Sequence, residues 1–332
     1  MYLTHAHPEQ SGGHDGEPVN ALLPSVFTRD KAEAYATWSG EGERLLARCS
    51  LWWSHTPALS GDRTAKVGVI GHYAAADLQA GSQLLRRACG TLRSAGCSVA
   101  IGPMNGNTWR DYRVILDDRD AAGFFLEPDS PAAWALHFQH AGFELFADYR
   151  SAVCDDLTMT DPRLERVGRR LSRQGVHLRT LRLDDLGDDL RAIHAVALEA
   201  FGGAMLYHPV TFVDFAESFQ PILDKIDPSL ILLAERRGET VGFCFGIPDY
   251  RQAVLPERID TMVLKTLAVK PERSLAGLGA LLMQRSHEAA RERGMRRVIH
   301  AMMHAANHRI IALSARYAQP MRRYGLFARK LH

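Results

Sequence analysis

The segment 266–282 constrains the fold most strongly, because an apolar run there leads through two glycines into a long helical pattern. The run Leu267–Val269 favours a β-strand, Gly277 and Gly279 indicate a tight turn, and the apolar spacing after them indicates an amphipathic helix. Such a strand–turn–helix unit directs several unpaired backbone N–H groups and the positive end of the helix dipole at one point. The pattern therefore predicts a site for a phosphate or pyrophosphate group.

Charge is spread unevenly along the 332 residues. The whole chain has 40 Lys and Arg residues against 38 Asp and Glu residues, a balance that argues against a dedicated nucleic-acid binder. Residues 270–332 alone hold 13 Lys and Arg residues but 3 acidic ones, a net charge of +10. Because this basic segment surrounds the glycine turn, it favours a polyanionic ligand over a merely solvated helix face.

Composition also limits the location and the partners of the protein. The five cysteines are odd in number and lack CxxC spacing, so we expect reduced thiols and a cytoplasmic protein. No apolar run is long enough to span a bilayer and no signal-peptide pattern is present, so we expect no membrane partner. Residues 1–23 are predicted to be a disordered tail, and its histidines are not expected to bind metal.

Two segments of the chain repeat one order of strands and helices, which predicts a mixed α/β sheet flanked by helices in each segment. The predicted strands of the first segment are 66–73, 98–102 and 143–149, and its predicted helices are 78–92 and 131–141. The predicted strands of the second segment are 177–182, 230–235, 241–246, 262–269, 297–303 and 324–329. Its predicted helices are 190–201, 277–293 and one that begins near Asn307. An arginine-rich helix is predicted between the two segments.

The glycine turn resembles the acyl-CoA-binding motif of the GCN5-related N-acetyltransferases, the GNAT superfamily. There a strand ending in hydrophobic-Ala-Val-x-Pro precedes a turn that reads Gln/Arg-x-x-Gly-x-Gly/Ala. The run 267–271 matches the strand and Gly277 and Gly279 match the turn, whereas Ser274 replaces Gln or Arg and Leu275 stands where Gly is common. The resemblance extends to both segments and implies a tandem GNAT protein. Its predicted parts are a degenerate GNAT-like domain at 24–155, a linker helix in 156–175 and an acetyl-CoA-binding GNAT domain at 176–332.

The first predicted domain departs from the acyl-CoA-binding pattern. Its turn, 77–85, retains only Gly81 of the two glycines, and its preceding strand lacks the hydrophobic-Ala-Val-x-Pro ending. A Cβ where backbone must approach phosphate is a steric obstacle. We therefore expect this domain to help form the substrate site rather than to bind coenzyme A.

The resemblance implies acetyl-CoA, or another acyl-CoA, as co-substrate and no metal. Main-chain groups of Leu267 and Val269 would pair with the pantetheine amides, and the turn would donate N–H groups to the pyrophosphate. The residues so implied are Leu267, Ala268, Val269, Arg273, Ser274, Leu275, Ala276, Gly277, Leu278, Gly279, Ala280 and Asn307.

Family members often protonate the leaving thiolate with a tyrosine in an Asn-x(6)-Tyr pattern on the final helix. Here Asn307 matches the Asn, but Ser314 occupies the tyrosine position and is therefore a candidate catalytic residue itself. Tyr317 lies one turn further on if the helix continues, and we favour it as the acid over Tyr324, which opens the predicted last strand. For the general base the candidates are His300, Asp260, His304, Tyr207 and His208, or a water relay.

The string 105–113 predicts a binding loop after the second strand of the first segment. The sequence Asn105-Gly-Asn is typical of a turn, and Trp109 and Arg110 follow it. Similar strings occur in tandem GNAT-like proteins. We predict that Asn105, Trp109 and Arg110, together with Tyr207, bind substrate; a turn anchored by a buried Trp would explain the same residues.

These observations predict direct transfer of an acetyl group from acetyl-CoA to an amine of a small molecule in the C-terminal domain. Two alternatives remain. The donor could be an aminoacyl-tRNA, which the altered turn and the arginine-rich helix favour. In that case tRNA would be the one nucleic-acid partner. The protein could instead be a non-catalytic module that binds coenzyme A, as the replacement by Ser314 would allow. No feature of the sequence specifies an oligomeric state.

Overall fold

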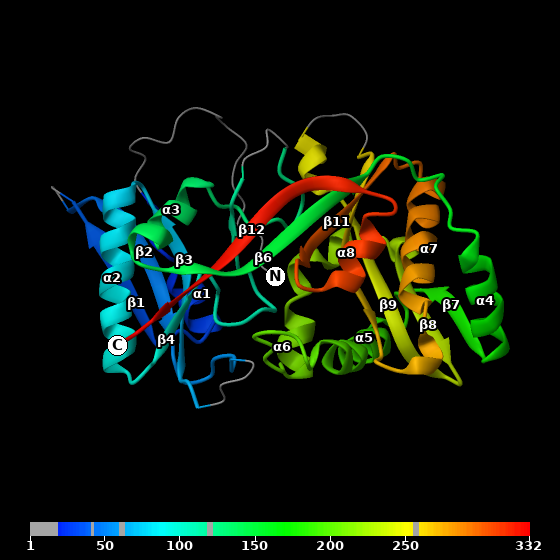
Figure 1. Cartoon of the computed structure of the whole chain (residues 1–332), viewed down its shortest axis with the longest axis horizontal. Coiled ribbons are helices and arrows are strands. Elements are labelled where there is room, and N and C mark those ends of the chain that lie inside the picture. The colour runs from blue at the N-terminus through cyan, green and yellow to red at the C-terminus, as the bar shows by residue number, and fades with distance from the viewer. Residues whose placement is uncertain (1–18, 41–42, 60–63, 118–121, 255–258) are drawn as a thin grey trace.

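The computed structural model describes residues 19–40, 43–59, 64–117, 122–254 and 259–332. Within these residues, strands from the whole length of the chain form one 12-stranded mixed sheet with helices on its faces (Figure 1). The strands are β1 (Ala34–Ser39), β2 (Leu45–Trp52), β3 (Val67–Ala75), β4 (Val99–Gly102), β5 (Val114–Ile115), β6 (Glu144–Cys154), β7 (Val176–Thr180), β8 (Ile231–Arg236), β9 (Glu239–Pro248), β10 (Thr261–Val269), β11 (Arg297–His304) and β12 (Gln319–Lys330).

Six of the described α-helices lie near predicted positions, whereas those at 24–29 and 212–217 were not predicted. The α-helices are α1 (Pro24–Arg29), α2 (Leu78–Ser94), α3 (Ala133–His140), α4 (Arg163–Arg173), α5 (Leu186–Phe201), α6 (Phe212–Glu217), α7 (Leu278–Glu292) and α8 (His308–Ser314). The 3₁₀ turns are η2 (Gln220–Lys225), η3 (Pro228–Leu230), η4 (Tyr250–Val254) and η5 (Arg273–Leu275). Helix α7 begins after Gly277 and ends just before Gly294, as the glycine pattern predicted.

The two halves of the chain exchange their last strands. The strand order is β1-β2-β3-β4-β12-β6-β11-β10-β9-β8-β7, with β5 beside β12. Strand β6 of the first half pairs with β11 of the second, and β12 of the second pairs with β4 of the first. Figure 1 shows β6 and β12 crossing the middle of the molecule. The predicted boundaries at 155 and 176 thus fall between elements, yet each predicted domain gives its last strand to the sheet of the other.

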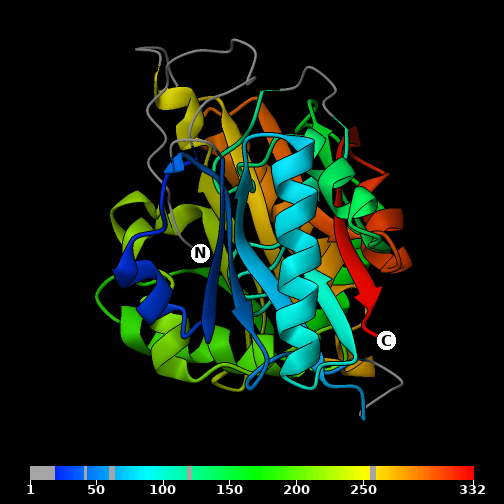
Figure 2. The same cartoon turned by 90° about the vertical axis from the view of Figure 1, so that its left-hand side faces the viewer.

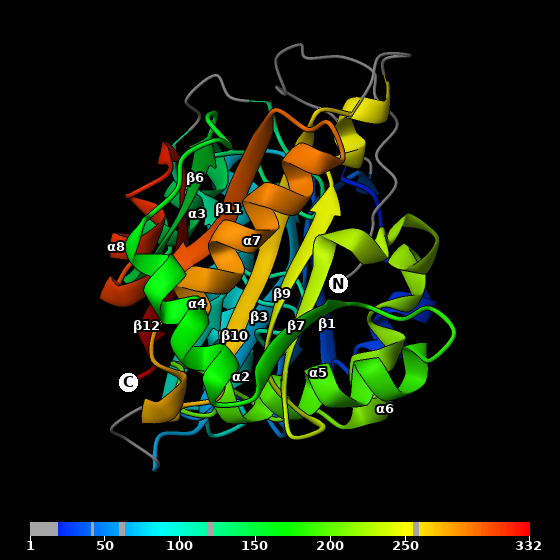
Figure 3. The same cartoon turned by 90° about the vertical axis from the view of Figure 1, so that its right-hand side faces the viewer.

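Helices cover each half of the sheet. Helix α2 packs on β1, β2 and β3 (Figure 2), and α7 packs on β8 to β11 with α4 beside it (Figure 3). Because side chains alternate along a strand, Phe243 and Phe245 of β9 face α5 whereas Cys244 faces α7. The apolar stripe of α4, Leu164, Val167 and Leu171, packs toward α7 as expected.

Three expectations need correction. Residues 1–18 of the predicted tail lie outside the described residues, but 19–23 are bound to β2, where Val19 N donates to Leu45 O at 3.2 Å. Helix α8 ends at Ser314 and does not reach Tyr317. Strand β12 begins at Gln319, five residues before its predicted start, because it pairs along the length of β6.

Candidate active site

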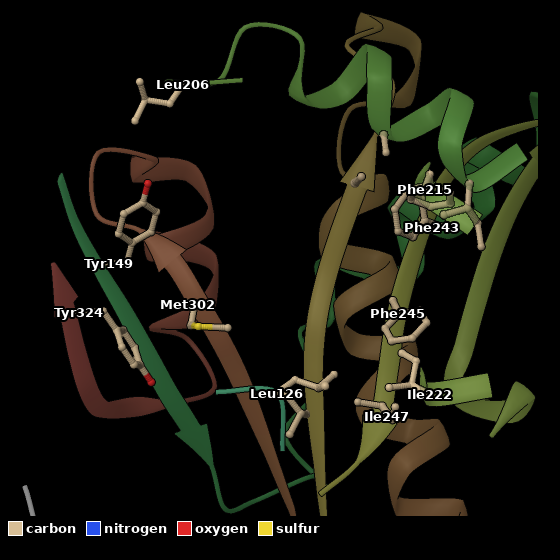
Figure 4. Packing of buried hydrophobic residues seen from close by; sticks show 14 of the residues in the cluster. Leu126, Tyr149, Leu206, Phe215, Ile222, Phe243, Phe245, Ile247, Met302 and Tyr324 are labelled. Carbon is tan, nitrogen blue, oxygen red and sulfur yellow. The ribbon is translucent and has the colours of Figure 1, made fainter. Parts of the chain in front are cut away.

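The parallel strands β10 and β11 pair only at their first residues. The paired stretches are Thr261–Leu264 and Arg297–His300. Each strand then bulges, and beyond the bulges β10 stays with β9 while β11 stays with β6. The two neighbours therefore diverge. Figure 4 shows Met302 pointing from β11 toward β10 and Leu126 lying between the two strands.

The register of β10 determines which of its backbone groups face the divergence. Lys270 N donates to Val241 O at 2.9 Å, so this residue faces β9. In an antiparallel pair, hydrogen-bonded and non-bonded positions alternate. The peptide groups of Leu267 and Val269 therefore point away from β9 toward the gap, which is the orientation that pairing with a pantetheine chain requires.

A cavity of about 660 Å³ occupies the place where β10 and β11 diverge, a size typical of small-molecule sites. Its walls come from β10, β11, β6, α5 and the loop 108–113, so both halves of the chain contribute. It brings together seven of the predicted site residues: Trp109, Arg110, Tyr207, Leu267, His300, His304 and Asn307.

Lys265 is the bulge residue of β10 and lines the cavity. Its Nζ donates to the carbonyl oxygen of Leu126 at 3.2 Å. Burial, with a smaller contribution from the charge of Arg113, lowers the pKa of Lys265 to about 7, although Asp111 acts in the opposite direction. A large fraction of this amine is therefore neutral near pH 7 and able to accept a proton.

Three residues of the loop after β4 also reach the cavity. Asp111, Tyr112 and Arg113 line it, and burial raises the pKa of the Asp111 carboxyl. The Arg113 guanidinium lies 3.7 Å from the ring centroid of Tyr112 and 4.3 Å from that of Tyr149, which β6 supplies. The strand exchange thus places a residue of the first half against the diverging strands of the second.

The predicted substrate residues divide into two groups. Trp109 and Tyr207 form one wall; the Trp109 Nε1 donates to His208 O at 2.8 Å, and its ring lies 6.3 Å from that of Tyr207. Arg110 lines the cavity but donates to the backbone oxygen of Asp30 at 3.0 Å. Asn105 lies outside the cavity, because its side-chain oxygen accepts a hydrogen bond from the backbone N–H of His72. This hydrogen bond gives Asn105 a structural role, and its contact with substrate stays a prediction.

His300 and Ser314, both predicted to be catalytic, belong to a buried chain of hydrogen bonds. The His300 Nδ1 lies 2.7 Å from the Ser314 Oγ, and its Nε2 lies 2.8 Å from the Nε2 of His287. Burial lowers the pKa of His300 to about 3. A ring with both nitrogens engaged and so low a pKa is a weak base, and Ser314 lies behind it, outside the cavity.

The two predicted tyrosine acids also lie outside the cavity lining. Tyr317 follows the end of α8 and packs in the cluster beneath α7, with its ring 5.3 Å from that of His287. Tyr324 is fully buried, and its hydroxyl lies 3.0 Å from the Ser151 Oγ and donates to Glu127. The Ser151 Oγ accepts from the Met302 N–H at 3.0 Å, so Tyr324 supports the β11 bulge rather than contacting a ligand.

The turn before α7 differs from an ordinary capped helix start. Gly277 has a φ of +86°, and a Cβ there would come within 2.8 Å of Val167. Among the described residues, no side chain caps this helix, so its first N–H groups remain available. Gly277 and Ala276 are exposed, whereas Leu275 and Leu278 are buried and anchor the turn. The Ser274 Oγ accepts from Arg236 and donates to Glu272, and Arg273 is exposed beside it.

Sequence reasoning missed Lys265 and Tyr149 and committed to no role for Asp111 and Arg113. A lysine inside the apolar strand Met262–Val269 was the available signal for Lys265, because a buried amine in a strand is unusual. Tyr149 carried no such signal, since its place depends on the strand exchange.

The divergent parallel strands, the uncapped helix start and the cavity shared by both halves are the main features of this site. The Acetyltransferase (GNAT) family model matches residues 200–317. The matched segment contains β10, β11, α7 and the turn before α7. A search of curated proteins gives no match to the sequence.

Several solved structures share the fold. One is a GCN5-related N-acetyltransferase from Sphaerobacter thermophilus, with 16% identity over 90% of this chain and 81% of that chain and a TM-score of 0.51. A tandem GNAT protein from the clavulanic acid biosynthesis pathway (without AcCoA) has 15% identity, coverage of 96% and 91%, and a TM-score of 0.50. A probable N-acyltransferase from Enterococcus faecalis V583 has 11% identity, coverage of 92% and 65%, and a TM-score of 0.55. At these identities the likeness shows the fold alone.

Among the described residues, no helix has the length and apolar character needed to cross a bilayer. The same residues contain no group of three or more His, Cys, Asp or Glu side chains placed to hold a metal ion.

Proposed function

We propose that this protein transfers an acyl group, in the first instance acetyl, from an acyl-CoA thioester to an amine of a small molecule. The observation that carries the proposal is the coincidence of three features in the second half: diverging parallel strands, a cavity between them and an uncapped helix start at Gly277. An extended chain fits the divergence, and a pyrophosphate suits the free N–H groups.

The residues present suit an acyl-CoA chemically. Leu267 and Val269 offer unpaired peptide groups along the gap, and the segment 277–280 offers backbone donors at the start of α7. A Cβ at Gly277 would meet Val167, so glycine keeps this turn exposed while α4 packs against it. Arg273 adds an exposed positive charge, and Asn307 lines the cavity at the start of α8.

The chain's own groups account for the proton movements. Acetyl-CoA supplies an activated carbonyl with a thiolate leaving group. As the amine nitrogen bonds to this carbonyl carbon and the carbon–sulfur bond breaks, the neutral Lys265 amine accepts the proton from nitrogen. The same ammonium then returns a proton to the departing sulfur. With a pKa of about 7, Lys265 is suited to both transfers near neutral pH.

The first half contributes walls rather than a second coenzyme A site in this proposal. Tyr149, Trp109 and Arg113 come from it and line the shared cavity. Its own strand–helix unit is closed, because Met104 N donates to Ile70 O at 2.8 Å and fills the space beside β3. Asp77 also caps α2 by accepting from Ala80 N at 2.7 Å.

The arginine-rich helix α4, which motivated the tRNA alternative, is partly engaged within the protein. Arg163 pairs with Asp161 at 2.8 Å, Arg169 with Glu165 at 3.6 Å, and Arg170 donates to the Ala276 carbonyl. These contacts supply structural reasons for three of its five arginines. Arg166 and Arg173 are exposed.

Calorimetric titration with acetyl-CoA, followed by thiol release with a panel of amines, tests the proposal. We expect binding of one molecule per chain and acylated product by mass spectrometry. Binding without product from any amine would favour the non-catalytic module. A shift of aminoacyl-tRNA at stated salt, without acetyl-CoA binding, would favour the tRNA-dependent alternative.

A further inference from the structure

Arg113 has an uncommon backbone conformation for its residue type. Its φ is +86°, in the left-handed region that a non-glycine residue adopts only at a cost. Such outliers persist where the surrounding structure holds them, and they concentrate at ligand sites. Here the Arg113 N–H donates to Pro103 O at 2.9 Å, and the side chain enters the cavity.

The Arg113 guanidinium lies against two tyrosine rings and has no acidic partner among the described residues. The rings of Tyr112 and Tyr149 meet each other at 86°, and both lie within 4.3 Å of the guanidinium carbon. Among the described residues, its Nε is buried without a hydrogen-bond partner, and no carboxylate pairs with the side chain within 4.0 Å. A planar fork of donors held in this way matches the two oxygens of a carboxylate.

The charges around the cavity favour an anion as well. Of the described residues that line it, Asp111 is the one carboxylate, whereas Arg110 and Arg113 are cations and Lys265, with a pKa of about 7, is charged in part. The carboxylate of Asp30 pairs with Arg110, with a distance of 3.6 Å between the Arg110 Nε and the Asp30 Oδ1. Burial raises the pKa of Asp111, which reduces the negative charge it supplies. Arg113 lowers the pKa of both Lys265 and His304, although burial contributes more in each case, so its positive field reaches both groups.

The geometry points to an acceptor that carries a carboxylate as well as its amine, with the carboxylate bound by the Arg113 side chain between Tyr112 and Tyr149. This inference rests on the proposed acyl transfer and narrows the acceptor to amino acids and related amino carboxylates. The carboxylate accepts a hydrogen bond from the unpaired Nε of Arg113 and balances the charge of its guanidinium. It also leaves the amine in the same cavity as Lys265.

Matched pairs of acceptors test the inference. The panel is α-, β- and γ-amino acids, each with its own carboxamide, which keeps the shape and removes the charge. Thiol release from acetyl-CoA gives kcat/KM for each member, with product mass as confirmation. Arg113→Gly removes the guanidinium and suits the positive φ, Arg113→Lys keeps a charge but not the fork, and Arg166→Gln removes an exposed arginine of α4 as control.

We expect wild-type protein to prefer at least one acid over its carboxamide by about 10-fold or more. Arg113→Gly should lower kcat/KM for that acid by about 10- to 100-fold and leave the carboxamide within about twofold, while Arg113→Lys retains part of the preference. Equal use of acids and carboxamides, or an equal loss for both in Arg113→Gly, would overturn the inference while leaving acyl transfer intact. Absence of turnover together with absence of acetyl-CoA binding would overturn the proposed function and this inference with it.

Discussion

The two strand–turn–helix units of this molecule, β3–α2 and β10–α7, have the same order of elements, but the first is closed and the second is open to a cavity. Each has a parallel neighbour that pairs only with its first residues, and each bulges soon afterwards. In the first unit Met104 N donates to Ile70 O at 2.8 Å, so the chain itself fills the space beyond the pairing. In the second unit that space is the cavity.

The residues at the two bulges, His72 and Lys265, also differ in how fully their side chains are hydrogen-bonded within the protein. His72 of β3 is satisfied on both ring nitrogens, by Asp30 at 2.8 Å and Ser50 at 2.9 Å. Lys265 of β10 contacts one backbone oxygen and otherwise faces the cavity. Asp77 caps α2, whereas Gly277 leaves α7 uncapped. A few side chains thus decide whether this plan becomes a closed structural unit or an open site.

The largest expected effect comes from Lys265. Lys265→Met removes the proposed base and should lower kcat by about 100-fold or more. The neutral amine is the active form, so wild-type kcat/KM should rise with pH and level off above the pKa of about 7, and the variant should lose this limb. Rates of thiol release between pH 5.5 and 9 measure both.

His72→Gln is the matched change in the first unit. It breaks the contacts with Asp30 and Ser50 and should reduce stability, but the folded protein should keep its kcat. A loss of kcat similar to that of Lys265→Met would erase the proposed difference between the two bulges.

The next effect concerns the helix starts. Ala276→Asp places a carboxylate beside the uncapped end of α7, as Asp77 does in α2, and should weaken acetyl-CoA binding by about 50-fold through repulsion of the phosphates. Ala276→Asn has nearly the same shape without the charge and should bind within about threefold of wild type. Calorimetric Kd values compare the two. Equal affinities would show that the pyrophosphate does not bind at this turn.

A smaller effect is expected where the exchanged strands meet. Tyr324→Phe removes a hydroxyl that joins Ser151 to the buried Glu127, which also holds Arg322 at 2.6 Å. We expect the free energy of unfolding, measured with urea, to fall by about 1.5 kcal/mol.

Tyr317→Phe is its matched control. Among the described residues the Tyr317 hydroxyl is buried without a hydrogen-bond partner, so its loss should change the unfolding free energy by less than about 0.5 kcal/mol. It should also change kcat by less than about twofold, because Tyr317 lies outside the cavity. A ten-fold loss of kcat would restore Tyr317 as the thiolate acid.

The smallest effect tests closure of the first unit. Asp77→Ala removes the cap of α2 and should cost about 1 kcal/mol of stability. It should not create a second acetyl-CoA site, because Met104 and Asn105 still fill the space beside β3. A stoichiometry above one acetyl-CoA per chain in this variant would mean that the cap alone had closed the site.

The sequence predicted most of the helices and strands, because their signals are local, but not β1, β2, β5, α1 or α6. Glycines marked the ends of α7. The exchange of β6 and β12 is a long-range pairing. Neither strand has a residue pattern from which its neighbouring strand could be predicted. The roles proposed for Tyr149 and Arg113 could not be predicted from the sequence, because they also depend on contacts between distant parts of the chain.

The predicted catalytic residues Tyr317 and Tyr324 lie away from the cavity lining for a related reason. Tyr317 was placed by extending a helix that ends at Ser314, and Tyr324 by its order in the chain rather than by its side of the sheet. A bulge shifts the alternation of side chains along a strand. It therefore changes which side chains face a neighbouring cavity. The bulge at Lys265 is such a case.

A crystal structure with bound acetyl-CoA tests the difference between the two units most directly. We expect the pyrophosphate against the backbone of 277–280 and the pantetheine beside Leu267 and Val269, with the β3–α2 unit unchanged. Acetyl-CoA between Tyr73 and Leu85, or side chains filling the divergence of β10 and β11 in its presence, would contradict the proposed site.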